Sequence, residues 1–378
     1  MKRRLEQVPI PGEEPARERA WKVVRSAFAE REPRPRRSPL PRVAAVAVAL
    51  AAVLGAALSA PGRAVVDELR ELVGVERAQR ALFSLPAQGR LLVSSDAGMW
   101  VVGADGSKRL LGPYREASWS PFGRFVVAAR ADELAALEPD GDVRWTLARP
   151  GVRSPRWAGT ETDTRIAYAD RTGLRVVAGD GTGDRLLVPR ARGSLAWRPR
   201  ASFVLAYATA RRVRVVDAET GAPRWQAPRP RGPVRALEWS ADGRRLLLAS
   251  ARGIAVYGPR GARLYTLGPG AAPVTAAALA PHGRSLVFAQ QARGRSEAWV
   301  VPAIRPDASS ARRLLSGAGT LAGVAWSPDA RWVVVEWPTA DQLVFLRASG
   351  AGIRAVANVA EQFRTRSFPR VDGWCCPR

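Results

Sequence analysis

Short apolar runs alternate with turn sequences along most of the chain. Two 12-residue stretches of this kind, each a turn followed by an apolar run, have very similar sequences. Residues 239–250 read WSADGRRLLLAS, and residues 326–337 read WSPDARWVVVEW. Serine, proline, aspartate and glycine are the residues that favour tight turns, and the apolar run behind each turn has the length of a strand. The phrase therefore predicts a β-hairpin: a short strand ending at tryptophan, a tight turn and a longer, more apolar strand.

Related phrases recur through the chain at a nearly constant interval. Their anchor residues lie 38, 40, 42, 40 and 47 residues apart and are Trp119, Trp157, Trp197, Trp239, Leu279 and Trp326. A second turn recurs seven times, at Gly106, Gly141, Gly181, Gly221, Gly261, residues 306–314 and Gly350. One unit thus holds four short strands in about 40 residues, which is the period of a β-propeller blade.

The two kinds of turn do not match in number, because seven second turns accompany only six phrases. The seventh phrase stands near the last residue, where FPRVDGWCCP (368–377) carries Trp374, 48 residues after Trp326. If this stretch pairs with residues 88–112, both ends of the domain build one blade and few strand edges stay exposed. We predict an all-β, seven-bladed propeller over 88–378 closed by the C-terminal strand, with six blades as the alternative.

An uncharged apolar segment precedes the repeats. Residues 43–60 read VAAVAVALAAVLGAALSA, and 18 helical residues span about 27 Å, enough to cross a bilayer core. Residues 1–42 hold twelve Lys and Arg against six acids, so the positive-inside rule predicts a cytoplasmic N-terminus and an extracytoplasmic propeller. A cleaved signal peptide is the alternative, because Ala57-Leu58-Ser59 resembles a cleavage site, although a 42-residue leader is long for one.

The segments on either side of this span predict short helices. Residues 14–30 place Trp21, Val24 and Phe28 on one helical stripe, which either lies on the inner leaflet or docks into a cytoplasmic partner. Residues 61–87 have apolar positions at helical spacing and predict a stalk between the membrane and the propeller.

Charge narrows the choice of partners. The net charge is +25, but only Lys2, Lys22 and Lys108 are lysines, and the arginines are spread evenly rather than clustered on one element. No zinc-finger, helix-turn-helix or RNP-type pattern occurs, so we do not expect nucleic acid as a partner. The excess beyond residue 42 is +19, which favours anionic protein or cell-envelope ligands.

Residues able to carry chemistry are scarce. His282 is the one histidine and stands in a blade turn, APHGR, at the position that aspartate holds in SPDAR. The two cysteines, Cys375 and Cys376, are adjacent and form either a vicinal disulfide or two buried thiols. No G-x-S-x-G elbow occurs. We therefore predict no enzyme activity, no metal and no cofactor.

The repeated phrase resembles the WD40-like, or PD40, repeats of TolB-type propellers. The match is best at Trp239–Ser250 and Trp326–Val335 and extends over 88–378. The stretch DAETGAPRW (217–225) also matches the D-x-x-T-G-x-x-x-W pattern of quinoprotein-like propellers, but only once cleanly. The resemblance implies an extracytoplasmic domain that binds proteins or small ligands at its faces, and it transfers no catalytic residue.

Two functions follow from this layout. The first is a membrane-anchored propeller that acts as a non-enzymatic binding or scaffold module outside the cell. The alternative is a transmembrane signalling regulator, similar to anti-sigma proteins, that couples the propeller to a cytoplasmic partner through residues 14–30. Trp21, Val24 and Phe28 are the residues on which the alternative depends.

Overall fold

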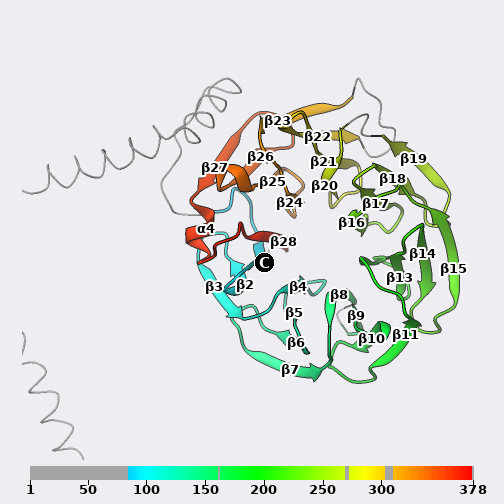
Figure 1. The fold of residues 1–378 in the computed structure, drawn as a ribbon. Helices are drawn as coiled ribbons and strands as arrows, with labels where there is room; N and C mark the ends of the chain where they lie inside the picture. Colours follow the sequence, from blue (N-terminus) through cyan, green and yellow to red (C-terminus); the bar gives the residue numbers. More distant parts are fainter. Residues whose placement is uncertain (1–83, 161, 269–271, 303–309, 377–378) are drawn as a thin grey trace, which may run out of the picture. The chain divides into compact units, whose positions relative to one another are not determined.

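The structure is a computed structural model that describes residues 84–160, 162–268, 272–302 and 310–376. Within these ranges the chain forms seven four-stranded antiparallel sheets arranged as the blades of a ring (Figure 1). The predicted seven-bladed propeller is confirmed, and the six-bladed alternative is wrong. The predicted tail, membrane span and most of the stalk lie outside the described residues. Within the described ranges, no helix is long and apolar enough to cross a membrane.

The blades are numbered along the chain, and the strands of each are named A to D from the centre outward. Blade 1 contains β28 (Arg370–Cys375), β1 (Arg90–Ser95), β2 (Gly98–Val102) and β3 (Lys108–Gly112). Blade 2 contains β4 (Glu116–Trp119), β5 (Val126–Arg130), β6 (Glu133–Leu137) and β7 (Val143–Ala148). Blade 3 contains β8 (Arg153–Gly159), β9 (Thr164–Ala169), β10 (Gly173–Ala178) and β11 (Arg185–Pro189). Blade 4 contains β12 (Leu195–Trp197), β13 (Val204–Ala208), β14 (Arg212–Asp217) and β15 (Pro223–Pro228).

The remaining blades have the same order. Blade 5 contains β16 (Val234–Trp239), β17 (Leu246–Ser250), β18 (Gly253–Tyr257) and β19 (Arg263–Leu267). Blade 6 contains β20 (Val274–Leu279), β21 (Ser285–Ala292), β22 (Arg295–Pro302) and β23 (Arg312–Ala318). Blade 7 contains β24 (Gly323–Trp326), β25 (Trp332–Trp337), β26 (Gln342–Arg347) and β27 (Ile353–Ala357). Two short helices, η1 (Pro338–Ala340) and α4 (Val359–Gln362), lie in connections of blade 7.

The last strand closes the ring. The antiparallel partner of β28 is β1, with Leu91 opposite Trp374 and Leu92 opposite Gly373. In Figure 1 the red β28 accordingly lies among the cyan strands of blade 1. The predicted pairing of the C-terminal stretch with residues 88–112 is confirmed, so two segments almost 280 residues apart in the sequence share one sheet.

Each tryptophan at the end of a strand A packs against the preceding blade. The partners are Arg90 for Trp119, Phe125 for Trp157, the Arg156 carbonyl for Trp197, Arg198 for Trp239, the Ala278 carbonyl for Trp326 and Phe345 for Trp374. In blade 6 the position is held by Leu279, which packs in one cluster with Leu247 of blade 5. The repeated residue of the sequence is therefore the residue that joins one blade to the next.

A second tryptophan contact joins the outer parts of blades. Trp225 of blade 4 covers Gly261 of blade 5 and donates its indole N–H to the Pro259 carbonyl at 3.0 Å. A Cβ at Gly261 would lie 2.8 Å from that ring, and its φ of +88° also requires glycine. In the same way, Trp145 of blade 2 covers Gly181 of blade 3. The quinoprotein-like pattern thus has a packing role in a ring of seven blades.

Carboxylates also connect neighbouring blades near the centre of the ring. The backbone N–H of Val371 on β28 donates to the Glu336 carboxylate of blade 7 at 2.7 Å. Glu238 of blade 5 accepts the Leu279 N–H of blade 6 in the same manner. Burial raises the pKa of Glu336 to about 7, helped by the Asp372 carboxylate, because only 5% of its surface is exposed.

The antiparallel order gives the ring two different faces. We call the side with the A–B and C–D turns the A–B face, and the side with the B–C turns and the D–A connections the B–C face. The described chain begins on the A–B face, where the Leu85 N–H donates to the Ala104 carbonyl of a C–D turn at 3.0 Å. It also ends there, because β28 runs toward Cys376, which contacts the A–B turn of blade 2 at Pro121.

Deletion of residues 366–378 removes β28 and is expected to abolish cooperative unfolding of the propeller. The deletion exposes the edge of β1 and leaves the Trp374 position between blades 1 and 7 empty. Thermal unfolding followed by near-ultraviolet circular dichroism measures this. A chain ending at residue 376 serves as the control and should melt like the full chain. A cooperative, unshifted transition in the deletion would contradict closure by β28.

The free energy of unfolding is expected to fall as pH rises from about 4.5 to 7. Because the folded pKa of Glu336 is raised, the folded state binds this proton more tightly than the unfolded state in that window. Glu336→Gln keeps the acceptor oxygen for Val371 and removes the titration. Denaturant titrations at several pH values should show the loss reduced by about 3 kcal/mol in the variant. Equal slopes in both proteins would contradict a raised pKa.

Candidate functional site

A groove runs over blades 1, 2 and 3 on the A–B face. It consists of three adjoining depressions of about 910, 860 and 320 Å³. The first two share Arg90, Pro139 and Cys376, and the last two share Phe122 and Arg144 among other residues. The groove therefore follows the place where the two ends of the propeller meet and continues onto blades 2 and 3.

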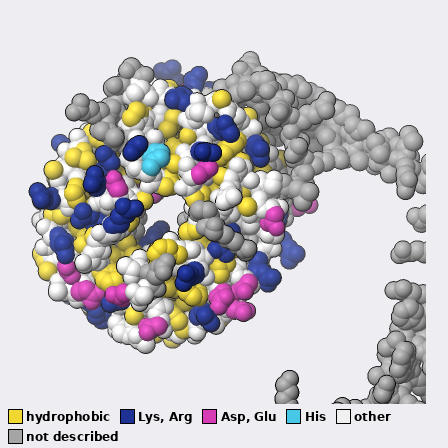
Figure 2. Space-filling view, turned by 180° about the vertical axis from the view of Figure 1, so that it is seen from behind, with side chains coloured by type: hydrophobic (Ala, Val, Ile, Leu, Met, Phe, Trp, Pro, Cys, Tyr) yellow, Lys and Arg dark blue, Asp and Glu magenta, His cyan; other side chains and the backbone are white. Residues whose placement is uncertain are grey.

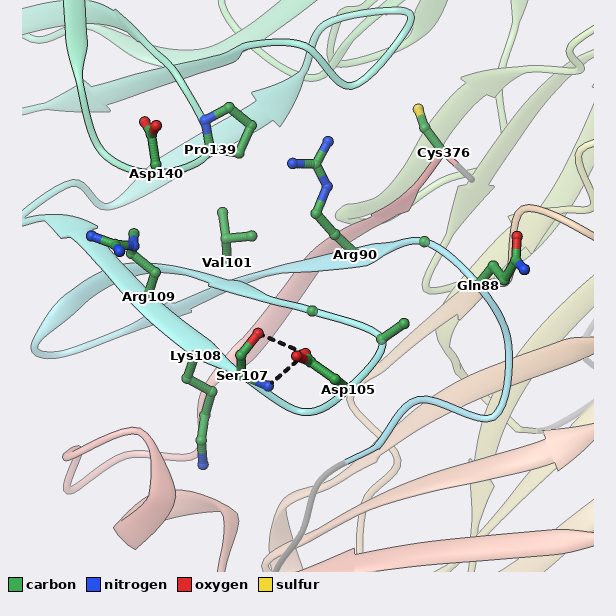
Figure 3. Close-up of a pocket in the computed structure, with 13 residues that line it drawn as sticks. Gln88, Arg90, Val101, Asp105, Ser107, Lys108, Arg109, Pro139, Asp140 and Cys376 are labelled. Carbon is green, nitrogen blue, oxygen red and sulfur yellow. Dashed lines mark hydrogen bonds between the residues drawn. The ribbon is translucent and has the colours of Figure 1, made fainter. Parts of the chain in front are cut away.

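The largest depression has a charged lining. Figure 3 shows Arg90, Val101 and Arg109 on the three strands β1, β2 and β3, with Asp140 facing them from the C–D turn of blade 2. The carboxylate of Asp105 accepts the backbone N–H and the hydroxyl of Ser107, at 3.0 and 2.6 Å. Both signs of charge line this end, so it offers hydrogen bonds and ion pairs to a ligand.

The other end of the groove is aromatic. The Phe125 ring stacks on Trp157 with centroids 5.9 Å apart, and the Arg144 guanidinium lies 5.6 Å from the Phe125 centroid. Phe122 stands beside this pair at the tip of an A–B turn with 49% of its surface exposed. Exposed aromatic side chains next to arginine are the composition of binding hot spots between proteins.

Cys376 lies between the charged and the aromatic ends. It is joined to Cys375 by a vicinal disulfide, and both residues are half-buried. Of the two alternatives open from the sequence, the pair of free buried thiols is therefore wrong. The Cys376 sulfur lies 3.8 Å from the Pro121 carbonyl oxygen, so the disulfide forms part of the groove wall.

Charged side chains also gather near the central hollow, which Figure 2 shows from the side opposite to Figure 1. Arg156 lies in this group, and its charged neighbours are the carboxylates of Asp372, Glu116 and Glu238 and the guanidinium of Arg370. Burial lowers the pKa of Arg156, while these carboxylates oppose that shift. Among the described residues, no group of three or more His, Cys, Asp or Glu side chains could hold a metal ion.

His282 lies in the A–B turn of blade 6, as its position in the repeat predicted. Its Nδ1 accepts the Arg284 N–H at 3.0 Å, just as Asp242 accepts the Arg244 N–H at 2.9 Å in blade 5. Burial and the nearby Arg284 lower the pKa of His282, a shift that favours the neutral form able to accept this hydrogen bond. It therefore serves as a turn residue.

Of the residues singled out in the sequence, the structure describes those of the repeats and not those of the tail. Trp119, Trp157, Trp197, Trp239, Leu279, Trp326 and Trp374 all lie on strands A. Trp21, Val24 and Phe28, which were predicted to bind a partner, lie outside the described residues.

The groove residues were not predicted, although Phe122 carried a signal. The turn of blade 2 reads SPFGR, whereas the equivalent turns read SADGR, APHGR and SPDAR. Phe122 thus occupies the position where blades 5, 6 and 7 have Asp242, His282 and Asp329, side chains that accept a turn hydrogen bond. An aromatic residue that gives up this bond at an exposed turn is a reason to expect contact with a ligand.

Comparisons with known proteins identify the fold and no nearer relative. No protein-family model matches the chain, and no curated protein is similar to it in sequence. A chain in the crystal structure of the mitotic checkpoint complex is similar over 73% of this chain and 94% of its own, with a TM-score of 0.54 and 18% identity. The Cps50 (Swd1) β-propeller domain of Myceliophteria thermophila is similar over 65% and 86%, with a TM-score of 0.51 and 15% identity. These likenesses show the β-propeller fold.

Proposed function

We propose that the chain is a single-pass membrane protein that presents its propeller outside the cell as a non-enzymatic binding scaffold. Residues 43–60 are the anchor in this proposal, residues 1–42 are cytoplasmic, and the propeller is of the PD40 or TolB-like type. The observation that carries the proposal is the groove, where exposed Phe122 lies beside the Phe125–Trp157 stack and Arg144.

The groove suits a protein partner better than a small molecule. It is a chain of open depressions over three blades rather than one enclosed cavity, and it combines an exposed aromatic anchor with arginines. It also lies on rigid elements, because the blades that carry it are joined by Trp119 and Trp157. A surface of this kind can bind an extended segment of a protein without rearranging.

The polar side chains of the groove support a binding role. The Asp105 carboxylate in its charged end accepts the hydroxyl and the backbone N–H of Ser107, and these hydrogen bonds hold a turn. His282 accepts a backbone N–H in a turn of blade 6. Binding is therefore the function that we assign to this surface.

A signalling regulator similar to anti-sigma proteins is the second candidate. The observation that favours it is the helical stripe of Trp21, Val24 and Phe28 in the tail, which fits a groove on a cytoplasmic partner. In that case the propeller would sense a ligand outside the cell, and the tail would pass the signal to the partner.

Phe122→Asp is expected to abolish capture of the protein partner in crosslinked pull-downs from native membranes. The substitution replaces the aromatic anchor with a charge. The fold should not change, because Phe122 is exposed at a turn where blades 5 and 7 have aspartate. Leu264→Asp is the matched control, because Leu264 on β19 of blade 5 is 51% exposed and lies outside the groove. Loss of the same partner in both variants, or in neither, would contradict the groove as the binding surface.

Removal of residues 1–35 is expected to leave the partners of the propeller in place. Trp21→Asp, which disrupts the helical stripe without shortening the tail, should likewise leave them unchanged. The same crosslinked pull-downs measure both effects. Partners that are lost with either change would favour the signalling function over the scaffold.

A further inference from the structure

Blades 3 to 6 carry a row of exposed arginines on the B–C face, which we call the arginine crescent. Its members come from B–C turns and D–A connections, and they are Arg171, Arg190, Arg192, Arg211, Arg212, Arg231, Arg252 and Arg293. The turns and connections of these blades contain one acidic residue, Asp170, which is 4% exposed and accepts the backbone N–H groups of Thr172 and Gly173. The crescent is therefore a surface of one sign.

The arginines of the A–B face are different in this respect. Arg144 pairs with Glu138, Arg185 with Glu219 and Arg224 with Asp217, at 3.2, 3.4 and 2.7 Å. Figure 2 shows Lys and Arg beside Asp and Glu on the face that carries the single histidine of the chain. Among the described residues, none of the eight crescent arginines takes part in an ion pair. Their charges are thus uncompensated within this part of the protein.

The loops that carry the crescent are held in place by hydrogen bonds. Arg192 donates to the Arg171 carbonyl at 3.1 Å, which holds two positive side chains on neighbouring loops of blade 3. In blades 4 and 5, Ser250 donates to the Arg231 carbonyl at 2.8 Å. Like charges on braced loops repel one another, so the surface is preorganised for an anion that relieves the repulsion.

The composition of the crescent narrows the choice of anion. Its loops contain no aromatic side chain, so bases of a nucleic acid would find no stacking platform. The exposed large apolar residues of the described chain, such as Phe122 and Leu264, lie on A–B turns or strands D instead. A folded protein or a bilayer that needs an apolar anchor finds none here. Guanidinium forks, by contrast, bind carboxylates through two parallel hydrogen bonds.

We propose that the arginine crescent is a second binding surface, distinct from the groove, and that it takes an extended acidic segment of a partner protein. Carboxylates of glutamate and aspartate side chains pair with the guanidinium forks, and a flexible chain passes from blade to blade along the row. The binding is electrostatic and weakens with salt.

The test measures binding of a fluorescent 16-residue polyglutamate peptide to the purified full chain in detergent, by anisotropy at low salt. A variant with Arg190, Arg192, Arg211 and Arg231 changed to Gln is expected to bind at least about tenfold more weakly. The matched control changes Arg200, Arg244, Arg284 and Arg331 to Gln, four exposed arginines of A–B turns outside the groove, and should bind within about twofold of the wild type. Equal losses in the two variants, or no binding to the wild type, would overturn the proposal.

Two further binding measurements test which kind of anion binds and whether the guanidinium groups are needed. Oligo-dT of equal charge and phosphatidylglycerol vesicles replace the peptide, and tighter binding to either would overturn the choice of an acidic peptide. The same four crescent positions changed to Lys keep the charge and the fold, and should still bind more weakly than the wild type because the forks are lost. Full binding by the Lys variant would overturn the fork contacts. Since all arms use purified protein, their failure leaves the proposed anchoring untouched.

Discussion

The contact between the indole of each strand-A tryptophan and the preceding blade is the interaction on which the propeller depends. A four-stranded blade has two apolar faces and cannot bury them alone. The indoles fill the spaces between blades, and their repetition fixes the angle at which one blade follows another. Closure at Trp374 completes the series, because this residue of blade 1 packs against Phe345 of blade 7 and lies on β28, which pairs with β1. Without that last contact, the first and last blades would each keep an apolar face in water.

Closure also explains where the binding surfaces lie. Blade 1 has no covalent A–B turn, since β28 ends and β1 begins there. The space that a turn would fill is the charged end of the groove, bordered by Arg90 and the Cys375–Cys376 disulfide. The crescent on the B–C face depends instead on the composition of the loops that carry it. One face therefore has a shaped groove and the other a row of positive charge.

The ring was largely predictable from the sequence, and its surfaces were not. Trp119 to Trp374 repeat at one period, and the uneven count of turns indicated the shared blade, because a closed ring must have equal numbers of each strand. The crescent and the groove join residues that are close only in space, such as Arg90 and Phe122 or Arg171 and Arg192. The state of Cys375 and Cys376 was open as well, since adjacency allows a bond without requiring it. Only Phe122, an aromatic residue at an aspartate position, marked its site in the sequence.

Hydrogen exchange of the full chain, measured by mass spectrometry, tests the closed ring most directly. In a closed ring β1 and β28 are interior strands of a sheet, so their amides open only with the whole domain. We expect peptides covering Arg90–Ser95 and Arg370–Cys375 to exchange as slowly as the buried β17, Leu246–Ser250, of blade 5. Rapid exchange of either end strand, with β17 still protected, would show an open ring and contradict the account.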